Sequence, residues 1–181
     1  MNSTDAELIA MLAEPRQKAA AFSSIVRLYQ ERIYWHIRKM VLSHEDSNDV
    51  MQNTFMKAWN GIENFRGDSL ISTWLYRIAT NETLTFLTSK RMKNLQLMDD
   101  EESLMFQNLK ADSFFDGNDA EQKLQEAILT LPEKQRLVFN MKYFEDITYE
   151  EMEKILGTSV GALKASYHFA VKKVERFLES E

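Results

Sequence analysis

The chain has 181 residues, 44% of them hydrophobic, which is enough for one ordinary domain or two small helical ones and excludes a disordered chain. The formal net charge of -6 argues against nucleic-acid binding only as an average. The acidic excess is concentrated between residues 98 and 126, and the segment before it carries a slight basic excess.

The first half of the chain predicts three helices. Apolar residues recur at steps of three and four from residue 22 to residue 40, which is typical of a long amphipathic helix; they are Phe22, Val26, Tyr29, Ile33, Ile37 and Met40. Ser43 followed by Asp46 marks a second helix start, with an apolar stripe at Met51, Phe55, Ala58 and Trp59. A third helix is expected from about Ser72 into a basic patch at residues 90–93.

The second half predicts a linker followed by four shorter helices. Periodicity fades after residue 94, where acidic residues mix with turn formers. Helical patterns return over residues 120–129, 133–144, 149–156 and 160–178. We therefore expect an all-α protein with two small helical domains, residues 1–93 and 119–181, joined by an acidic linker over residues 94–118.

A helix-turn-helix is predicted within the second domain. Thr148 and Glu151 match a capping box, Gly157 ends that helix, and Ser159 caps the next one after a short turn. The last helix then presents an outer face with small residues for close approach and donors for bases or phosphates. This candidate DNA-reading face comprises Ser159, Gly161, Lys164, Ala165, His168, Phe169 and Lys172. A plain helical hairpin with a solvated face fits the periodicity equally well.

Both halves resemble one known family. The second half contains LPEKQRLVFNMKYFEDITYEEMEKILGTSVGALKASYHFAVKKVERFL, which resembles the minus-thirty-five-reading domain of bacterial sigma factors of the extracytoplasmic-function (ECF) group. The first half contains DVMQNTFMKAWNGIENFRGDSLISTWLYRIATNETLTFL, which is similar to the domain of those factors that binds core RNA polymerase and melts the minus-ten element. Because both matches occur in the family's order, the resemblance implies a factor that directs polymerase to promoters and nucleates melting.

The resemblance also implies a minus-ten site in the first domain. A loop with Phe65, Arg66, Gly67 and Asp68 would hold a flipped base of the non-template strand, and the following helix would present Arg77 and Asn81 to DNA. Trp74 fits either a DNA contact or core packing, as does Tyr76. Lys90 and Arg91 stand where the family often carries a run of arginines, so they are expected to meet phosphates.

Protein partners are implied in the same way. Asp49, Gln52, Asn53 and Met56 form the polar face expected to bind core RNA polymerase, although Asn53 replaces the family's usual acidic residue. An anti-sigma factor is expected from the family alone. Met51, Met56 and Met141 are candidates for its interface, although methionine at helical spacing is more often core. The usual Thr and two usual Arg of the reading helix are Ala162, Ser166 and Phe169, so promoter preference cannot be copied from other members.

Two other classes of protein compete with this interpretation. A stand-alone helix-turn-helix regulator would bind duplex operator DNA, but no receiver or ligand-binding pattern precedes the second domain. An enzyme is not expected, because the three histidines lie on separate elements and no phosphate loop or paired metal-ligand spacing occurs. We expect no cofactor and no metal. Absence of cysteine and of any long apolar run predicts a cytoplasmic protein without membrane insertion.

Overall fold

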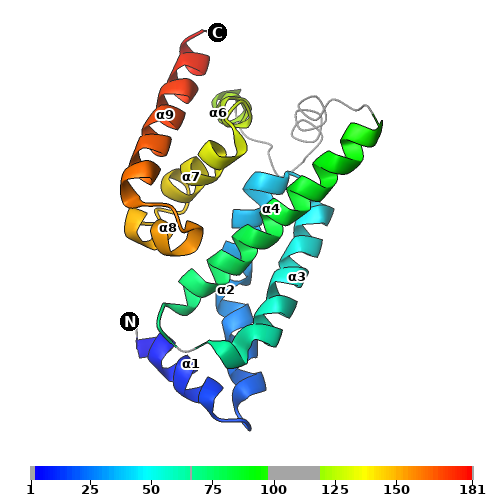
Figure 1. The fold of residues 1–181 in the computed structure, drawn as a ribbon, viewed down its shortest axis with the longest axis vertical. Helices are drawn as coiled ribbons and strands as arrows, with labels where there is room; N and C mark the ends of the chain where they lie inside the picture. Colours follow the sequence, from blue (N-terminus) through cyan, green and yellow to red (C-terminus); the bar gives the residue numbers. More distant parts are fainter. Residues whose placement is uncertain (1–2, 66, 98–118, 181) are drawn as a thin grey trace.

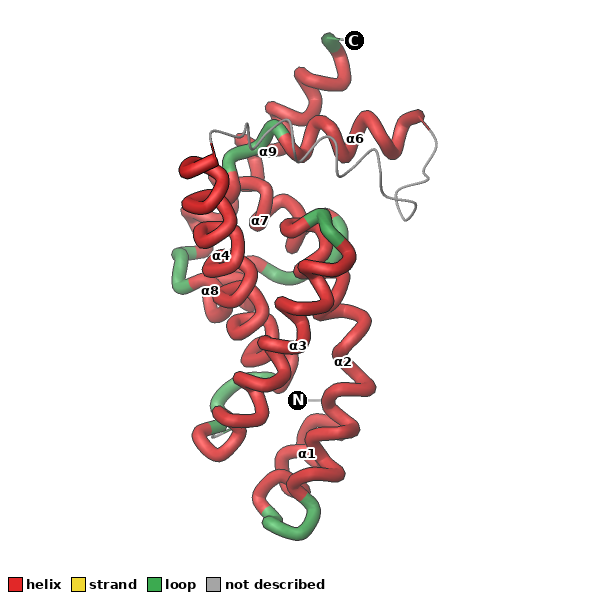
Figure 2. The backbone as a smooth tube through the Cα atoms, turned by 90° about the vertical axis from the view of Figure 1, so that its right-hand side faces the viewer, coloured by secondary structure: helices red, strands yellow, loops and turns green. Residues whose placement is uncertain are grey.

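The computed structural model describes residues 3–65, 67–97 and 119–180, and within them regular structure is helical with no strand (Figure 2). The all-α expectation is confirmed. The helices of the first half are α1 (Ser3–Ala13), α2 (Lys18–Val41), α3 (His44–Gly61), the short 3-10 helix η1 (Ile62–Asn64) and α4 (Ile71–Leu97). Those of the second half are α6 (Asp119–Leu129), α7 (Glu133–Tyr143), α8 (Tyr149–Leu156) and α9 (Val160–Glu179). Residues 98–118 of the expected linker lie outside the described residues.

Helices α2, α3 and α4 form the predicted bundle (Figure 1). The apolar stripe of α2 buries Ile33, Ile37 and Met40 completely. Helix α3 begins where the sequence predicts, because the Ser43 side chain accepts a hydrogen bond from the Asp46 N–H at 3.2 Å. Helix α4 starts one residue before the expected Ser72 and extends through Leu97.

Helix α1 was not predicted from the sequence. It packs on α2 and buries Leu8, while buried Asp5 accepts a hydrogen bond from the Tyr29 hydroxyl at 3.1 Å. Burial, together with the neighbouring Asp5 carboxylate, raises the pKa of Tyr29 to about 12. A helix of 11 residues is marginal on its own, so its formation depends on this packing rather than on local propensity.

The helix-turn-helix forms as predicted from its caps. Thr148 and Glu151 make the reciprocal capping box at the start of α8. Gly157 ends α8 in the left-handed region at φ 65°, and the Ser159 side chain accepts the Ala162 N–H at 3.4 Å. The inner side of α9 buries Leu163, Ala170 and Val174, opposite the predicted outer face.

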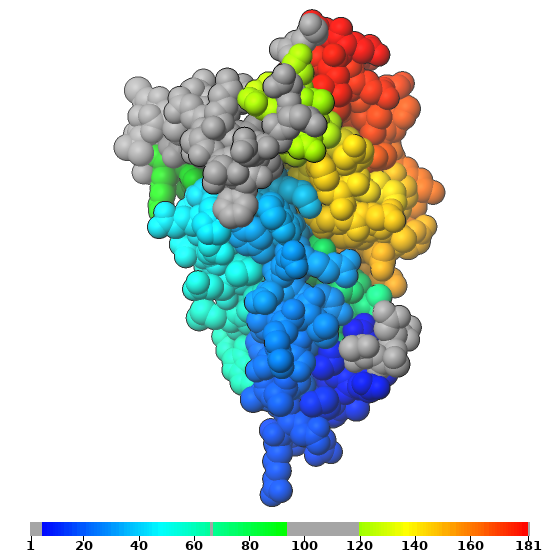
Figure 3. Space-filling view, turned by 180° about the vertical axis from the view of Figure 1, so that it is seen from behind, coloured from blue at the N-terminus to red at the C-terminus, as the bar shows by residue number. Residues whose placement is uncertain are grey.

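The two helical domains pack directly against each other. Helix α8 lies against α4 and α7 lies against α2, and Figure 3 shows α7 (yellow) seated on α2 (blue). One apolar cluster therefore runs through both domains and includes Met40 and Leu75 of the first with Met141 and Ile155 of the second. Met141 is fully buried in this cluster, so it is not available to an anti-sigma factor while the domains are packed together. None of the described helices combines the length and the apolar character that a membrane span requires.

Candidate nucleic-acid interface

The loop between η1 and α4 places aromatic side chains next to a glycine turn. The Phe65 and Trp74 rings lie 5.0 Å apart between centroids, and both are half-buried. Gly67 adopts φ 75°, a conformation that side chains other than glycine rarely take, and Asp68 is exposed beside it. Arg66 lies outside the described residues. The described members of the predicted pocket therefore occupy one loop.

Two aromatic residues at the start of α4, Trp74 and Tyr76, lie in different environments, although the sequence left the role of both open. Tyr76 is buried, with 3% of its surface exposed, and it belongs to the apolar cluster shared by the domains. Trp74 is half-buried against Phe65 and lies beside Gly61, whose ideal Cβ position would be 3.8 Å from the indole. Core packing thus accounts for Tyr76, whereas Trp74 keeps a partly open ring at the loop.

The two predicted DNA-contacting residues of α4, Arg77 and Asn81, differ in their contacts with the second domain. Arg77 and Asn81 are both exposed on one side of the helix, as expected. The Arg77 guanidinium, however, donates through both Nε and Nη2 to the Lys154 carbonyl of α8. Arg77 is therefore engaged by the second domain.

Two cations of the basic patch on α4, Lys90 and Arg91, form ion pairs. Lys90 Nζ lies 2.7 Å from Asp46 of α3, and Arg91 Nη2 lies 2.8 Å from Glu133 of α7. Both pairs are partly exposed, so each stabilises the fold only weakly, and phosphate groups can compete for the two cations.

The outer face of α9 is open along its length. All seven residues of the candidate DNA-reading face are exposed, and Phe169 has 57% of its surface exposed. Lys164 Nζ lies 5.7 Å from the centroid of the Tyr149 ring, so its ammonium group is attracted to the first residue of α8. In Figure 1, α9 lies at the outer edge of the second domain, with α7 between it and the first domain.

The predicted polymerase-binding face lies on α3. Asp49, Gln52, Asn53 and Met56 are all exposed, and 62% of the Met56 surface is accessible. An apolar groove of about 450 Å³ adjoins this face between α2 and α3. Its lining comprises Phe22, Val26, Gln30, Met51, Gln52, Phe55, Met56 and Trp59. Trp59, expected in the buried stripe, is 40% exposed and packs edge-on against Phe22, because the inner side of α3 is formed by Val50, Thr54 and Ala58.

One polar cluster at the domain boundary was not singled out as a site from the sequence. His36 of α2 is 1% exposed, and its ring contacts Glu145 in the loop between α7 and α8. His36 is thus a helix residue of the domain interface. No local signal marks Glu145, because the two residues are 109 positions apart in the chain.

Comparisons with known proteins match both domains. The family models described as Sigma-70 region 2 and Sigma-70, region 4 match residues 25–92 and 121–174. The ECF RNA polymerase sigma factor SigW of Bacillus subtilis (strain 168) is 30% identical over 156 residues, covering 82% of this chain and 83% of that protein. The ECF RNA polymerase sigma-E factor of Haemophilus influenzae is 28% identical, covering 97% of this chain and 96% of that protein.

Solved structures show the same fold. CnrH, solved in complex with the cytosolic domain of CnrY, superposes with a TM-score of 0.71 at 21% identity, over 99% of both chains. The sigma factor RpoE, solved with the anti-sigma factor NepR from Bartonella quintana, gives a TM-score of 0.66 at 20% identity, over 87% of this chain and 96% of that one.

The fold and the two matched regions define a sigma factor of the sigma-70 class. The chain belongs to its ECF group. It is a factor that directs RNA polymerase to promoters, and the interpretation as a stand-alone helix-turn-helix regulator is not favoured.

Proposed function

We propose that the first domain, residues 1–93, binds core RNA polymerase and melts the minus-ten element, while the second domain, residues 119–181, reads the minus-thirty-five element. The observation that carries this division is the occurrence of both matched regions, in order, on one chain. The connecting linker was expected over residues 94–118, but residues 94–97 continue α4, so the linker in this proposal begins after Leu97.

The loop from Phe65 to Asp68 and the start of α4 receive the melted strand. Extraction of a base from a duplex costs a few kcal/mol, and stacking on an aromatic ring returns about 1 to 3 kcal/mol per base. Phe65 and Trp74 supply such rings, and Arg66 is a hydrogen-bonding group of the same loop. Arg77 and Asn81 contact the adjoining strand, and Lys90 and Arg91 exchange their carboxylate partners for phosphates.

Helix α9 enters the major groove with its outer face. Gly161 and Ala165 allow the backbone close to the base edges, and Lys164, His168 and Lys172 donate to bases or phosphates. Ser159 lies at the helix N-terminus, where backbone N–H groups favour phosphate oxygens. Phe169 offers an apolar contact for a thymine methyl group.

Protein partners bind the first domain at α3 and at the groove between α2 and α3. Asp49, Gln52, Asn53 and Met56 contact core polymerase, and the apolar groove beside them extends that surface. An anti-sigma factor is the second partner, a proposal supported by the solved complexes of CnrH with CnrY and of RpoE with NepR. We place the protein in the cytoplasm, where polymerase acts, and assign the chemistry of RNA synthesis to polymerase alone.

Run-off transcription from sheared genomic DNA of the host tests this function. Core polymerase is assayed with and without the protein, and the new RNA 5′ ends are sequenced. We expect new starts that share a two-part upstream motif. Absence of new starts, combined with binding to duplex DNA without polymerase, would favour a stand-alone regulator instead.

A further inference from the structure

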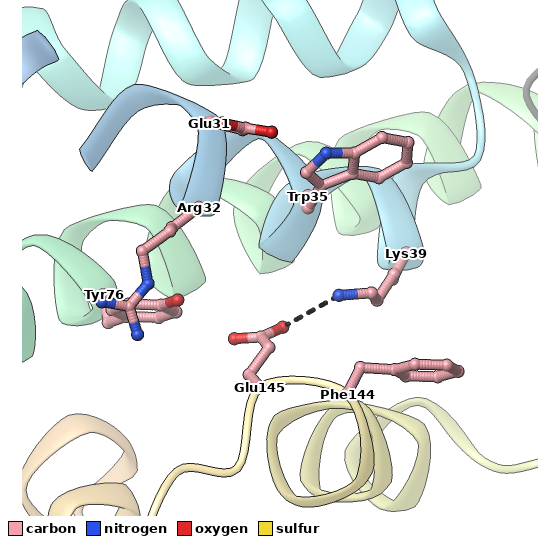
Figure 4. A pocket seen from close by; sticks show the side chains of 7 residues that line it. All are labelled: Glu31, Arg32, Trp35, Lys39, Tyr76, Phe144 and Glu145. Carbon is pink, nitrogen blue, oxygen red and sulfur yellow. Dashed lines mark ion pairs between the residues drawn. The ribbon is translucent and has the colours of Figure 1, made fainter. Parts of the chain in front are cut away.

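Beside the shared apolar cluster, the contact between the domains includes a carboxylate of the second domain inserted into the first. Glu145 lies in the loop between α7 and α8, and its side chain is only 7% exposed (Figure 4). His36 Nδ1 lies 3.2 and 3.1 Å from the two carboxylate oxygens and donates to them, while Lys39 Nζ lies 3.7 Å away. Every ion pair or hydrogen bond described for this side chain thus reaches the first domain.

The receiving pocket is built from α2 and α4. Figure 4 shows Arg32, Trp35 and Lys39 on α2 and Tyr76 on α4 around Glu145, in a cavity of about 470 Å³. His36 is held in place from its other side, because its Nε2 lies 2.9 Å from the Thr80 hydroxyl of α4. The His36 ring is therefore positioned by α4 as well as by its own helix.

Electrostatics favour a charged Glu145 in this position. Burial by itself would raise the pKa of the Glu145 carboxyl, but His36, Lys39 and Tyr76 together hold that pKa below its ordinary value. Burial lowers the pKa of Lys39, although Glu145 opposes the shift. A buried ionic contact of this kind gains little net free energy, because desolvation offsets much of the attraction. A contact with a small net free energy can be broken when the domains separate.

The packed arrangement engages groups that the proposed function assigns to DNA. Arg77 donates to the Lys154 carbonyl near the end of α8, and Arg91 pairs with Glu133 of α7. Asn140 of α7 also donates to the Lys39 carbonyl at 3.4 Å. Arg77 cannot contact DNA while its guanidinium donates to the Lys154 carbonyl of α8. The side of α4 that carries Arg77 therefore binds either α8 or a DNA strand.

We propose that the loop 144–147 is an autoinhibitory latch, in which Glu145 seated between His36 and Lys39 keeps α8 on α4 and Arg77 away from promoter DNA. The inhibitory effect of the latch rests on the proposed function, because it requires Arg77 to bind promoter DNA. The packing of the two domains does not depend on that proposal. Withdrawal of Glu145 separates the domains and frees Arg77 and Arg91. Polymerase binding then selects the open arrangement, whose population is low in the free protein.

The first test uses the free, full-length protein in solution. Glu145→Lys places a cation among Arg32, His36 and Lys39, so we expect a larger radius of gyration by small-angle X-ray scattering than for the wild type. Glu175→Lys is the matched control, because it makes the same charge change at an exposed site of α9 and leaves the latch intact. Circular dichroism verifies that each variant keeps its helices.

Clear outcomes overturn the latch. An extended wild-type protein, or a compact Glu145→Lys protein with normal helicity, contradicts it. Glu145→Gln provides a second variant of the same size, which loses the charge and is expected to open to a smaller extent. None of these measurements requires polymerase or DNA, so the latch and the proposed function can fail separately.

The functional consequence is tested with core polymerase at a promoter located by the run-off experiment. At limiting protein concentration we expect Glu145→Lys to raise the rate of open-complex formation about five-fold or more, in the usual range for coupled conformational equilibria. Glu175→Lys should leave the rate close to that of the wild type. An equal increase in both variants would show that added positive charge, rather than release of Arg77, is responsible.

Discussion

Arg77 and Asn81 share the exposed side of α4, but Arg77 alone of these two is seen to contact α8 through its side chain. If both touch the melted strand, Arg77→Ala and Asn81→Ala will slow promoter opening more than they weaken initial binding. A loss of about ten-fold in opening rate is expected for each, in the range of a single good contact to a base. Stopped-flow fluorescence on a labelled promoter measures the two steps, and equal losses in both would assign these residues to the fold.

The charge on Glu145 gives the domain packing a defined pH dependence. Since the pKa of this carboxyl is lower in the packed arrangement than its ordinary value of 4.5, the packing is stabilised above that pH and loses this contribution as the pH falls below it. The titratable groups facing it are Arg32, His36 and Lys39 of α2 and Tyr76 of α4, with the acids Glu31, Asp146 and Glu151 nearby.

Small-angle scattering from neutral pH to well below the ordinary pKa of 4.5 measures that dependence, because the contribution is lost only as the pH falls through the lowered pKa. We expect the wild-type protein to expand at the acidic end before its helicity falls, as followed by circular dichroism. Glu145→Gln should lack this step, because it carries no titratable group at that position. A wild-type protein whose size and helicity change together would assign the transition to general acid unfolding.

At the scale of single elements, the turn of the helix-turn-helix depends on one glycine. Gly157 has φ 65°, and an added Cβ would meet nothing within 4 Å, so substitution strains the backbone without a steric clash. Gly157→Ala should lower the free energy of unfolding by about 1 kcal/mol. Gly161→Ala is the matched control, because this glycine lies inside α9 with open space around it and should stabilise the helix slightly. Urea unfolding compares the two, and equal effects would contradict the backbone argument.

Helix α9 is predicted to read sequence through few side chains. Lys164→Ala and His168→Ala should each reduce binding to the upstream element by about 1 to 3 kcal/mol if the residue makes a good base contact. A phosphate contact instead lowers affinity for all sequences and reduces the salt dependence. Competition between promoters with intact and scrambled upstream elements, at two salt concentrations, separates these cases. If neither the sequence preference nor the salt dependence changes, the residue does not belong to the DNA interface.

Elements with explicit local signals were predictable from the sequence. The Thr148–Glu151 capping box, the Ser43 cap and Gly157 each involve residues a few positions apart, so their chemistry can be recognised in the chain itself. Helix α1 could not be predicted in this way, since it depends on packing against α2. The burial of Tyr76 and exposure of Trp59 were equally inaccessible, because both depend on which neighbouring helix covers each face.

At the scale of the whole molecule, the sequence predicts two helical domains but not their packing. Glu145 and Arg77 find their partners 109 and 77 positions away, and the resemblance to a family says nothing of those contacts in the free chain. Arg77, Asn81 and the candidate residues of α9 are exposed as expected, whereas Phe65 and Trp74 are half-buried. The contacts of Arg77 and Arg91 with the second domain became visible only in the folded protein. The molecule thus combines an α9 whose outer face is exposed with an α4 that is partly covered by the second domain.

Permanganate reactivity of promoter thymines tests the central claim, promoter melting by this factor with polymerase, most directly. On a promoter found by run-off transcription, we predict reactive thymines around the minus-ten element only when protein and core polymerase are both present, with loss of reactivity for Arg77→Ala. Protein that protects the duplex while every thymine stays unreactive, with or without polymerase, would contradict the account.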